Sequence, residues 1–273
     1  MSRPVCLVSG SSSGIGAAVV GEFAAHGYDV VLNYHSGADR AHAIAQRLQA
    51  EHGVTAVVIG ADLSQPEGPF SLVDQAWERF GRLDVAVSNS GVSSYVRDEA
   101  GRLVRYRFQD TPVDHLEREM RQALGLNLMG AYRLGQRALA RMIEQAEAET
   151  AAGQGPAHRS LLFITSISDL APETTRIPYG VSKAGLNHAV LGAALEGGPH
   201  NVTVNALRPG VVDTPLTARP SGVTDPDTGT ELTVAQVYAL MAIGGAQPIP
   251  RIGRPEDIAA AAYAFCPPPY MTR

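Results

Sequence analysis

Val5-Cys6-Leu7-Val8-Ser9 runs directly into Gly10-Ser11-Ser12-Ser13-Gly14-Ile15-Gly16, and this stretch near the N-terminus decides the fold. The first five residues are typical of a short buried strand, and an apolar helical pattern begins at about Ile15 and ends at His26. Glycines between a strand and a helix permit a tight turn and let backbone N–H groups approach a pyrophosphate at the helix N-terminus. A glycine cluster alone is also typical of a flexible loop, but this placement predicts the first unit of a dinucleotide-binding sheet.

Downstream, short β-branched runs alternate with longer helical patterns, which is typical of parallel βαβ units. Hydrophobic residues make up 45% of the 273 residues, which is enough for one large core. We therefore expect an α/β fold, a single-domain Rossmann-type doubly wound parallel sheet over residues 1–273 with helices on both faces. The further strands are expected at Val30–Asn33, Val54–Gly60, Val85–Ser88, Ser160–Ser166 and Val202–Ala206, and the main helices at Ala38–Glu51, Pro69–Phe80, Val113–Ala123, Leu126–Glu149 and Tyr179–Glu196.

Two segments do not follow this alternation. The polar segment Tyr95–Asp110 predicts a surface loop or hairpin, and we interpret its four arginines (Arg97, Arg102, Arg105 and Arg107) as solvent-facing rather than as contacts to an anionic substrate or a neighbouring subunit. The segment from Thr214 to Pro250 is rich in Pro, Gly, Asp and Thr, with one helical pattern near Val234–Ile243. It is long enough to act as a substrate lid at about residues 214–250.

Charge and composition exclude several classes of protein. The formal net charge of -5 leaves no basic surface for nucleic acid or an anionic membrane. The two cysteines, Cys6 and Cys266, are too few for a disulfide framework or a tetrathiolate metal site. No signal peptide and no run of about 20 apolar residues is present, which favours a cytoplasmic protein with no membrane partner.

The tail of the second predicted strand bears on the choice of cofactor. An acidic residue there would bind the ribose 2′-hydroxyl and favour NAD, but this chain has Asn33-Tyr34-His35-Ser36. A 2′-phosphate would meet no repulsion, and His35 and Ser36 can donate hydrogen bonds to it, with Arg40 within reach. We therefore predict a preference for NADP(H), with NAD(H) possible if Tyr34 merely packs on the ribose.

A second set of residues points to proton transfer. Tyr179 and Lys183 stand four apart at the start of a predicted helix, so both project from one face. A nearby ammonium favours the phenolate and brings the pKa of a tyrosine toward the working range of an acid–base catalyst. Ser166 ends the fifth predicted strand, at the edge of the sheet where ligands bind, and its hydroxyl can donate to a substrate oxygen. Asn127 lies in an apolar helical run, either as a satisfied core amide or as a holder of water for proton exchange.

Together these motifs resemble the short-chain dehydrogenase/reductase family, in order and spacing, from about residue 3 to residue 266. The closest resemblance is to members labelled 3-oxoacyl-(acyl-carrier-protein) reductase, a label that covers many substrates. The motifs are Ser9-Gly10-x3-Gly14-Ile15-Gly16, Asp62, Asn89-Ser90-Gly91, Asn127, Ser166, Tyr179-x3-Lys183 and Pro209-Gly210-x3-Thr214.

The resemblance implies a catalytic tetrad of Ser166, Tyr179, Lys183 and Asn127, direct hydride transfer without a metal, and a homo-oligomer, either a tetramer or a dimer. Lys183 would also hold the nicotinamide ribose. The cofactor-binding residues that it implies, together with the 2′-site, are Gly10, Ser12, Ser13, Gly14, Ile15, Gly16, Tyr34, His35, Ser36, Asp62, Leu63, Asn89, Ser90, Gly91, Tyr179, Lys183, Pro209, Gly210, Val212 and Thr214.

Three departures from the family pattern stand out. Ser9 replaces the usual Thr and preserves a hydroxyl. Ser88-Asn89-Ser90-Gly91 replaces Asn-Asn-Ala-Gly, so local support of the strand is expected to differ. The sequence ends at Pro267–Arg273, where the family continues into a last strand, so we expect that strand to be missing and an edge of the sheet to be left open.

These observations predict an NAD(P)(H)-dependent oxidoreductase that reduces a ketone, of the 3-oxoacyl type or a related polar carbonyl. One alternative is a sugar or secondary-alcohol dehydrogenase with the same chemistry. A second is a dinucleotide-binding protein without turnover, which would have no need of Tyr179 or Lys183. Ser168, Asp169, Glu173 and Arg176 lie between Ser166 and Tyr179 and are interpreted either as contacts to a polar substrate or as ordinary loop residues.

Overall fold

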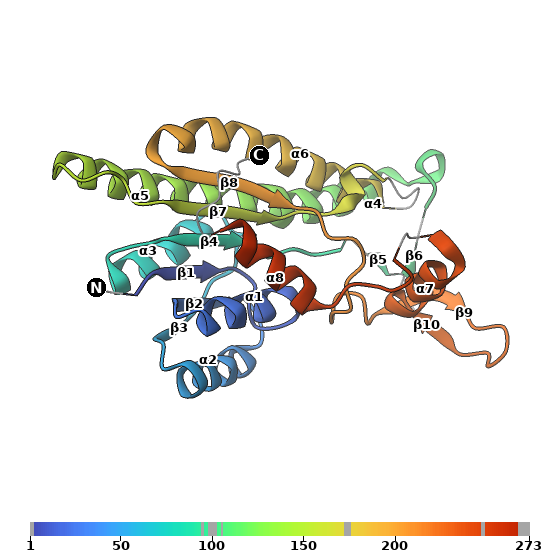
Figure 1. Ribbon diagram of the computed structural model, residues 1–273. Coiled ribbons are helices and arrows are strands. Elements are labelled where there is room, and N and C mark those ends of the chain that lie inside the picture. The colour runs from blue at the N-terminus through green and yellow to red at the C-terminus, as the bar shows by residue number, and fades with distance from the viewer. Residues whose placement is uncertain are drawn as a thin grey trace.

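A six-stranded parallel sheet forms the centre of the molecule in the computed structural model (Figure 1). The structure describes residues 3–93, 96–97, 103–104, 106–171, 176–246 and 249–266. The strand order is β3-β2-β1-β4-β7-β8, so the predicted doubly wound fold is confirmed. The strands are β1 (Val5–Val8), β2 (Asp29–Tyr34), β3 (Ala56–Gly60), β4 (Val85–Ser88), β7 (Arg159–Ile164) and β8 (Val202–Leu207).

Helices cover both faces of this sheet, because each strand directs apolar side chains alternately to one face and to the other. In β1, Val5 and Leu7 join one apolar cluster while Cys6 and Val8 join the other, because successive side chains of a strand point to opposite faces. Both clusters are buried, so the strands are apolar on both sides. The first face is covered by α3 (Gly68–Phe80), α5 (Ala131–Ala151) and α6 (Ile177–Gly197), and the second by α1 (Gly14–Ala25), α2 (Ala38–His52) and α8 (Pro255–Phe265).

The helical region before β7 differs from the prediction of two separate helices. α4 (Val113–Gln122) and α5 are joined without a break by a π-helical segment, η2 (Ala123–Gly130). Such wide turns are typical of functional sites, because the extra residue redirects side chains out of the regular helical ladder. The centre of this segment is Asn127, which is completely buried.

One helix, α8, was not predicted. Its alanine-rich sequence carries little periodic signal, since Ala fits both buried and exposed positions. Pro255 opens it and Asp257 accepts a hydrogen bond from the backbone N–H of Arg254 (2.8 Å). Tyr263 stacks on His26 of the α1 terminus (ring centroids 3.7 Å apart), so α8 packs on α1.

The segment that follows β8 forms a separate layer over the carboxyl ends of the strands (Figure 1). It contains a two-stranded ladder, β9 (Pro220–Thr224) with β10 (Glu231–Thr233), then α7 (Val234–Met241) and η5 (Ala242–Ala246). The helix was predicted but the ladder was not. The two ends of the segment are hydrogen-bonded to each other, since Gly253 donates to Val211 O (2.8 Å) and Asp213 donates to Gly253 O (2.9 Å).

The polar segment 95–110 contains a short antiparallel pair, β5 (Val96–Arg97) with β6 (Leu103–Val104), as expected of a hairpin, followed by η1 (Phe108–Asp110). Outside the described residues lie Arg102, Arg105, Glu173 and residues 267–273. Within the described residues β8 is the last strand at its edge of the sheet, as the predicted loss of a further strand implies. Two further short helical turns are η3 (Ile167–Asp169) and η4 (Gly198–His200). Within the described ranges, no helix combines the length and apolar character needed to cross a bilayer.

Candidate active site

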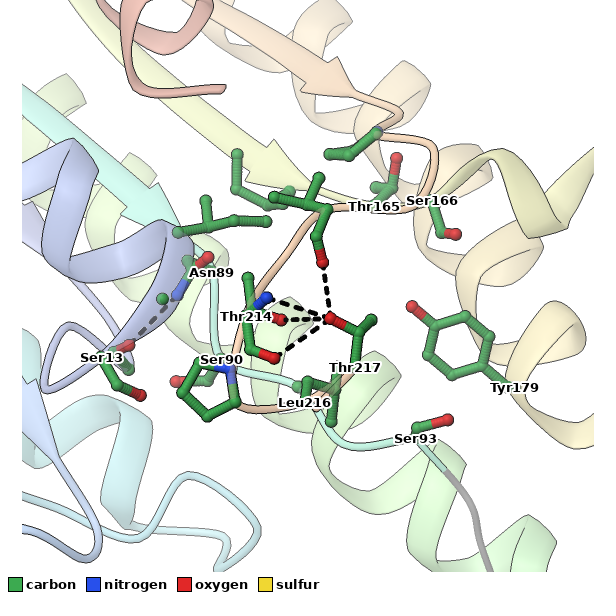
Figure 2. Close-up of a pocket in the computed structure, with 18 of the residues that line it drawn as sticks. Ser13, Asn89, Ser90, Ser93, Thr165, Ser166, Tyr179, Thr214, Leu216 and Thr217 are labelled. Atoms are coloured by element: carbon green, nitrogen blue, oxygen red, sulfur yellow. Dashed lines mark hydrogen bonds between the residues drawn. The ribbon is translucent and has the colours of Figure 1, made fainter. Parts of the chain in front are cut away.

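A cleft of about 980 Å³ lies at the carboxyl ends of the strands, where the turns after β1 and β4 separate. It brings together most residues that the sequence predicted for the site, from the glycine turn to the Tyr179 helix (Figure 2). Two of those residues, Gly16 and Asn127, do not line it. The predicted residues in its wall are Gly10, Ser12, Ser13, Gly14, Ile15, Tyr34, His35, Ser36, Asp62, Leu63, Asn89, Ser90, Gly91, Ser166, Tyr179, Lys183, Pro209, Gly210, Val212 and Thr214.

The glycine turn fits a pyrophosphate. Gly14 has a φ of +56°, a conformation that favours glycine, and it opens α1. The N-cap residue Ser13 makes no side-chain hydrogen bond to the helix end, so the first N–H groups of α1 are left for an anion in the cleft. A Cβ on Gly16 would stand 2.5 Å from Gly10 O and 2.6 Å from Asn89 Nδ2, so the turn packs as closely as glycine permits.

Buried polar side chains hold this turn against its neighbours. The Ser9 hydroxyl accepts the N–H groups of Asn89 (2.9 Å) and Ser90 (3.0 Å), and Asn89 Nδ2 donates to Ser9 O and Gly10 O. Ser9 and Asn89 therefore still support the turn despite the altered motif around residue 88. Asn33 Oδ1 accepts the Gly10 N–H (3.1 Å), while its Nδ2 donates to Ile59 O (3.2 Å). This role of Asn33 was not predicted, although an amide at the end of an apolar strand is a signal for it.

The expected adenosine end of the cleft is lined by the end of β2 and by the turn after β3. His35 is 71% exposed, and its Nε2 lies 3.7 Å from Asp62 Oδ2. Hydrogen bonds from Ser64 hold the pKa of the Asp62 carboxyl below its usual range. Arg40 folds back against Gly37, next to Ser36, so a guanidinium lies beside this end of the cleft.

Tyr179 and Ser166 lie on the same side of the cleft. Figure 2 shows the Tyr179 hydroxyl directed into the cavity, with Ser166 beside it and with Ser13 and Asn89 on the opposite side. Ser166 follows β7 and is the N-cap of η3, and its Oγ accepts the Ser168 N–H (3.1 Å). That bond uses an oxygen lone pair, so the Ser166 hydroxyl can still donate its own proton. In this structure the hydroxyl donates to Ser168 Oγ (3.1 Å).

Lys183 is almost fully buried beneath the tyrosine. Its Nζ lies 5.8 Å from the centroid of the Tyr179 ring and donates to Ile164 O (3.1 Å). Burial lowers the pKa of Lys183 from 10.5 to about 8. Lys183 is also the only lysine of the chain, since the other 21 of its 22 basic residues are arginines. A compact ammonium whose proton can be lost is therefore placed at this position alone.

Asn127 lies behind the cleft wall rather than in it. Its Oδ1 accepts the Val92 N–H (2.8 Å), and its Nδ2 donates to Val92 O (2.9 Å) and Ser182 Oγ (3.3 Å). Ser182 in turn donates to Tyr179 O (2.7 Å). The π-helical segment is thus tied both to the chain after β4 and to the tyrosine helix. Ser182 was missed by the sequence analysis, and a hydroxyl three residues after the tyrosine was the available signal.

The wall after β8 is held by Thr217. Its Oγ1 donates to Val212 O (2.7 Å) and accepts the Thr214 N–H (3.0 Å), as the dashed lines of Figure 2 show. The lid segment adds Val234, Tyr238, Met241 and Ile249 to the cleft lining. Sequence reasoning named the segment but none of these four contacts.

The residues between Ser166 and Tyr179 divide into two groups. Ser168 and Arg176 line the cleft, and the Arg176 guanidinium lies 4.7 Å from the centroid of the Tyr179 ring while donating to Ser93 Oγ (3.0 Å). Asp169 does not line it, because its side chain is buried against α6 and the chain after β8. The interpretation of Asp169 as a substrate contact is therefore wrong.

Comparison with known proteins agrees with this geometry. A family model described as short chain dehydrogenase matches residues 4–221. The chain is 32% identical over 257 residues to an L-rhamnose 1-dehydrogenase (NAD(P)(+)) of Azotobacter vinelandii, covering 93% of this chain and 85% of that one. It is 32% identical over 271 residues to the granaticin polyketide synthase putative ketoacyl reductase 2 of Streptomyces violaceoruber, covering 98% and 92%. The crystal structure of L-sorbose reductase from Gluconobacter frateurii, complexed with NADPH and L-sorbose, superposes with a TM-score of 0.79 at 25% identity, covering 97% and 90%.

Replacing Gly16 tests the glycine turn. In Gly16→Ala the added methyl group would displace Gly10 O and Asn89 Nδ2, so we expect NADPH affinity, measured by fluorescence titration, to fall at least about tenfold, equivalent to about 1.4 kcal/mol. Gly21→Ala is the matched control in the same helix, because its Cβ would meet only Leu48 Cδ2 at 4.0 Å. Equal affinities for the two variants would contradict this account of the turn.

The single lysine permits a direct measurement. In protein labelled with [ε-¹³C]lysine one lysine resonance is expected, titrating near pH 8 in the cofactor-free enzyme, because burial lowers the pKa of Lys183 to about 8. The folded chain then binds fewer protons than the unfolded chain between pH 8 and 10.5, so this group makes folding more favourable as pH rises through that window. A midpoint close to 10.5 would show that the ammonium is solvated instead.

Proposed function

Because the chain belongs to the short-chain dehydrogenase/reductase family and is an NAD(P)-dependent oxidoreductase, we propose that it reduces a ketone with NADPH and that Tyr179 delivers the proton. The observation that carries the proposal is the cleft itself. The Tyr179 hydroxyl is directed into this cleft, the buried Lys183 Nζ lies 5.8 Å from the centroid of the tyrosine ring, and the glycine turn lies on the opposite side, which supports a bound dinucleotide facing Tyr179.

In this proposal each polar side chain has one task. When bound, a nicotinamide dinucleotide supplies the hydride, or accepts it in the reverse reaction. Tyr179 Oη gives its proton to the carbonyl oxygen, and Ser166 Oγ donates a hydrogen bond to the same oxygen. The Lys183 ammonium stabilises the phenolate that Tyr179 becomes. Asn127 supports the tyrosine helix through Ser182, and its use as a holder of water stays a prediction.

The substrate class follows from the lid side of the cleft. Val234, Met241 and Ile249 present apolar surface there, and the exposed fractions of Met241 and Ile249 are 49% and 65%. Apolar walls favour a ketone with a hydrocarbon portion, such as a 3-oxoacyl compound, over a polyol. The similarity to a ketoacyl reductase supports the same choice.

The alternative, oxidation of a sugar or other secondary alcohol, rests on polar residues of the same cleft lining. Ser93, Ser168 and Arg176 supply hydroxyl and guanidinium donors that suit a polyhydroxy substrate. The similarity to an L-rhamnose dehydrogenase supports it. The homo-oligomeric state, the cytoplasmic location and the single domain with its lid stay predictions.

The preference for NADP(H) is argued from the end of β2. No carboxylate stands among Asn33 to Ser36, while the exposed His35 and the nearby Arg40 can donate to a 2′-phosphate. Asp62 beside His35 is the one opposing charge at this end of the described cleft, and NAD(H) remains the alternative cofactor.

Removing the phenolic hydroxyl tests the proton donor. We expect Tyr179→Phe to lower kcat at least about 10³-fold for ketone reduction, because general acid catalysis is lost while the ring is retained. NADPH affinity should stay within about twofold, since the substitution leaves the glycine turn intact. Steady-state NADPH oxidation with a panel of 3-oxoacyl thioesters and cyclic ketones, and NADP⁺ reduction with sugars, gives both values. Persistent turnover in Tyr179→Phe would remove the residue from its role, whereas cofactor binding without turnover by the parent enzyme would favour the non-catalytic alternative.

A charge placed at residue 35 tests the cofactor preference. His35→Asp puts a carboxylate where a 2′-phosphate is expected, so the ratio of kcat/KM for NADPH to that for NADH should fall at least about tenfold. His35→Asn is the matched control, since it has the same shape without the charge. If both variants changed the ratio equally, electrostatic discrimination at this position would be excluded.

A further inference from the structure

One buried carboxylate outside the cleft joins the chain after β7, the helix α6 and the chain after β8, which carry the proposed chemistry. Asp169 ends η3, three residues after Ser166, and its side chain is 4% exposed. It does not line the cleft, so it does not serve the substrate directly.

The contacts of Asp169 reach two other segments. Its Oδ2 accepts a hydrogen bond from Asn187 Nδ2 (2.6 Å), and Arg208 Nε lies 3.0 Å from the same oxygen. Asn187 stands one helical turn beyond Lys183 and two beyond Tyr179 on α6, so it lies on the helix face that carries both. Arg208 follows the last residue of β8 and directly precedes Pro209 and Gly210, which line the cleft.

Among the residues that the structure describes, backbone hydrogen bonds join only two of these segments. Thr165 donates to Leu207 O (2.8 Å) and Ile167 donates to Pro209 O (3.1 Å), which couples the chain after β7 to the chain after β8. Asp169 adds the tyrosine helix to that pair through Asn187. We call Asp169, Asn187 and Arg208 the three-segment junction.

We propose that Asp169 is a positioning residue, which sets the relative placement of Ser166, Tyr179 and the Pro209-Gly210 wall through the three-segment junction. The proposal rests on the proposed function, because it concerns the same reacting groups. Ser166 and Tyr179 belong to different elements, and a shift of about 1 Å between reacting groups lowers a rate by up to about 100-fold.

The bonding of the junction makes it sensitive to substitution. Both contacts converge on Oδ2, and within the described part of the chain the other buried oxygens, Asp169 Oδ1 and Asn187 Oδ1, have no hydrogen-bond partner. Loss of the charge or reversal of one donor therefore leaves buried groups unmatched, and the packing must adjust. Residues of α6 near this contact include the reacting Tyr179 and Lys183.

Four variants separate positioning from general stability. Asp169→Asn keeps the shape of the side chain and removes its charge. Asn187→Asp places a second carboxylate against that of Asp169. The double variant Asp169→Asn with Asn187→Asp exchanges donor and acceptor and restores one carboxylate facing one amide. Arg208→Gln removes the half-exposed cation and leaves the Asn187 contact intact, so it remains informative if the other single variants fold poorly.

The matched control is Asp84→Asn at the opposite end of the sheet. Like Asp169, Asp84 is a buried carboxylate that pairs with an arginine, here Arg82. Asp84 Oδ2 accepts the backbone N–H of Val5 (2.7 Å). Loss of the Asp84 charge should lower the free energy of unfolding without changing the geometry of the cleft.

The expected result is a fall in kcat of about 10- to 100-fold in Asp169→Asn and Asn187→Asp, with partial recovery in the exchanged pair and NADPH affinity within about twofold throughout. The titration midpoint of the single lysine resonance should rise in the same single variants, because loosening of α6 admits water to Lys183, and should recover in the exchange. Asp84→Asn should leave both readouts unchanged.

Wild-type kcat and an unshifted lysine midpoint in both Asp169→Asn and Arg208→Gln would overturn the proposal. The lysine resonance reports on the junction whether or not a substrate has been found. Failure of the parent enzyme to turn over any substrate would count against the proposed function, and an unmoved resonance would count against the junction.

Discussion

The reversal of strand order between β1 and β4 is the constraint on which the rest of the structure depends. The strands on either side of it are wound in opposite directions, so α1 leaves β1 over one face of the sheet while the chain after β4 leaves toward the other. A crevice must open where these two connections part. The glycine turn, the Asn89 turn and the Tyr179 helix all meet there because parallel strands end at one edge.

Polar side chains at the strand ends turn this crevice into a defined site. Asn33, Ser9 and Asn89 bind the backbone of neighbouring turns beside the glycine turn, whereas Asp169 binds the side chains of Asn187 and Arg208 on the Tyr179 side. Strand pairing stops at this edge, so the loops beyond it need other hydrogen-bond partners. Buried amides, hydroxyls and carboxylates supply them, and they also set the distances between loops.

Electrostatics in the site depend on one residue type being kept rare. Arginine supplies the other 21 of the 22 lysine and arginine side chains, including Arg176 over the Tyr179 ring and Arg208 in the three-segment junction. Lys183 can lose its proton near pH 8 whereas the arginines cannot, because guanidinium groups stay protonated in proteins. The ammonium that the proposed mechanism uses is thus the single lysine of the chain, buried beside the Tyr179 ring.

The sequence by itself determined the parallel sheet, the glycine turn and the pairing of Tyr179 with Lys183, because strand alternation and i,i+4 spacing are local properties of the chain. It did not determine α8, whose alanines carry no clear period, or the π-helical segment around Asn127, whose side chain bonds to Val92 thirty-five residues away. Nor did it separate Asp169 from Ser168 and Arg176, which line the cleft. Only the tertiary structure decided that, because Asn187 and Arg208 meet Asp169 through the packing of α6 against the ends of β7 and β8, and no pattern in the sequence records such a contact.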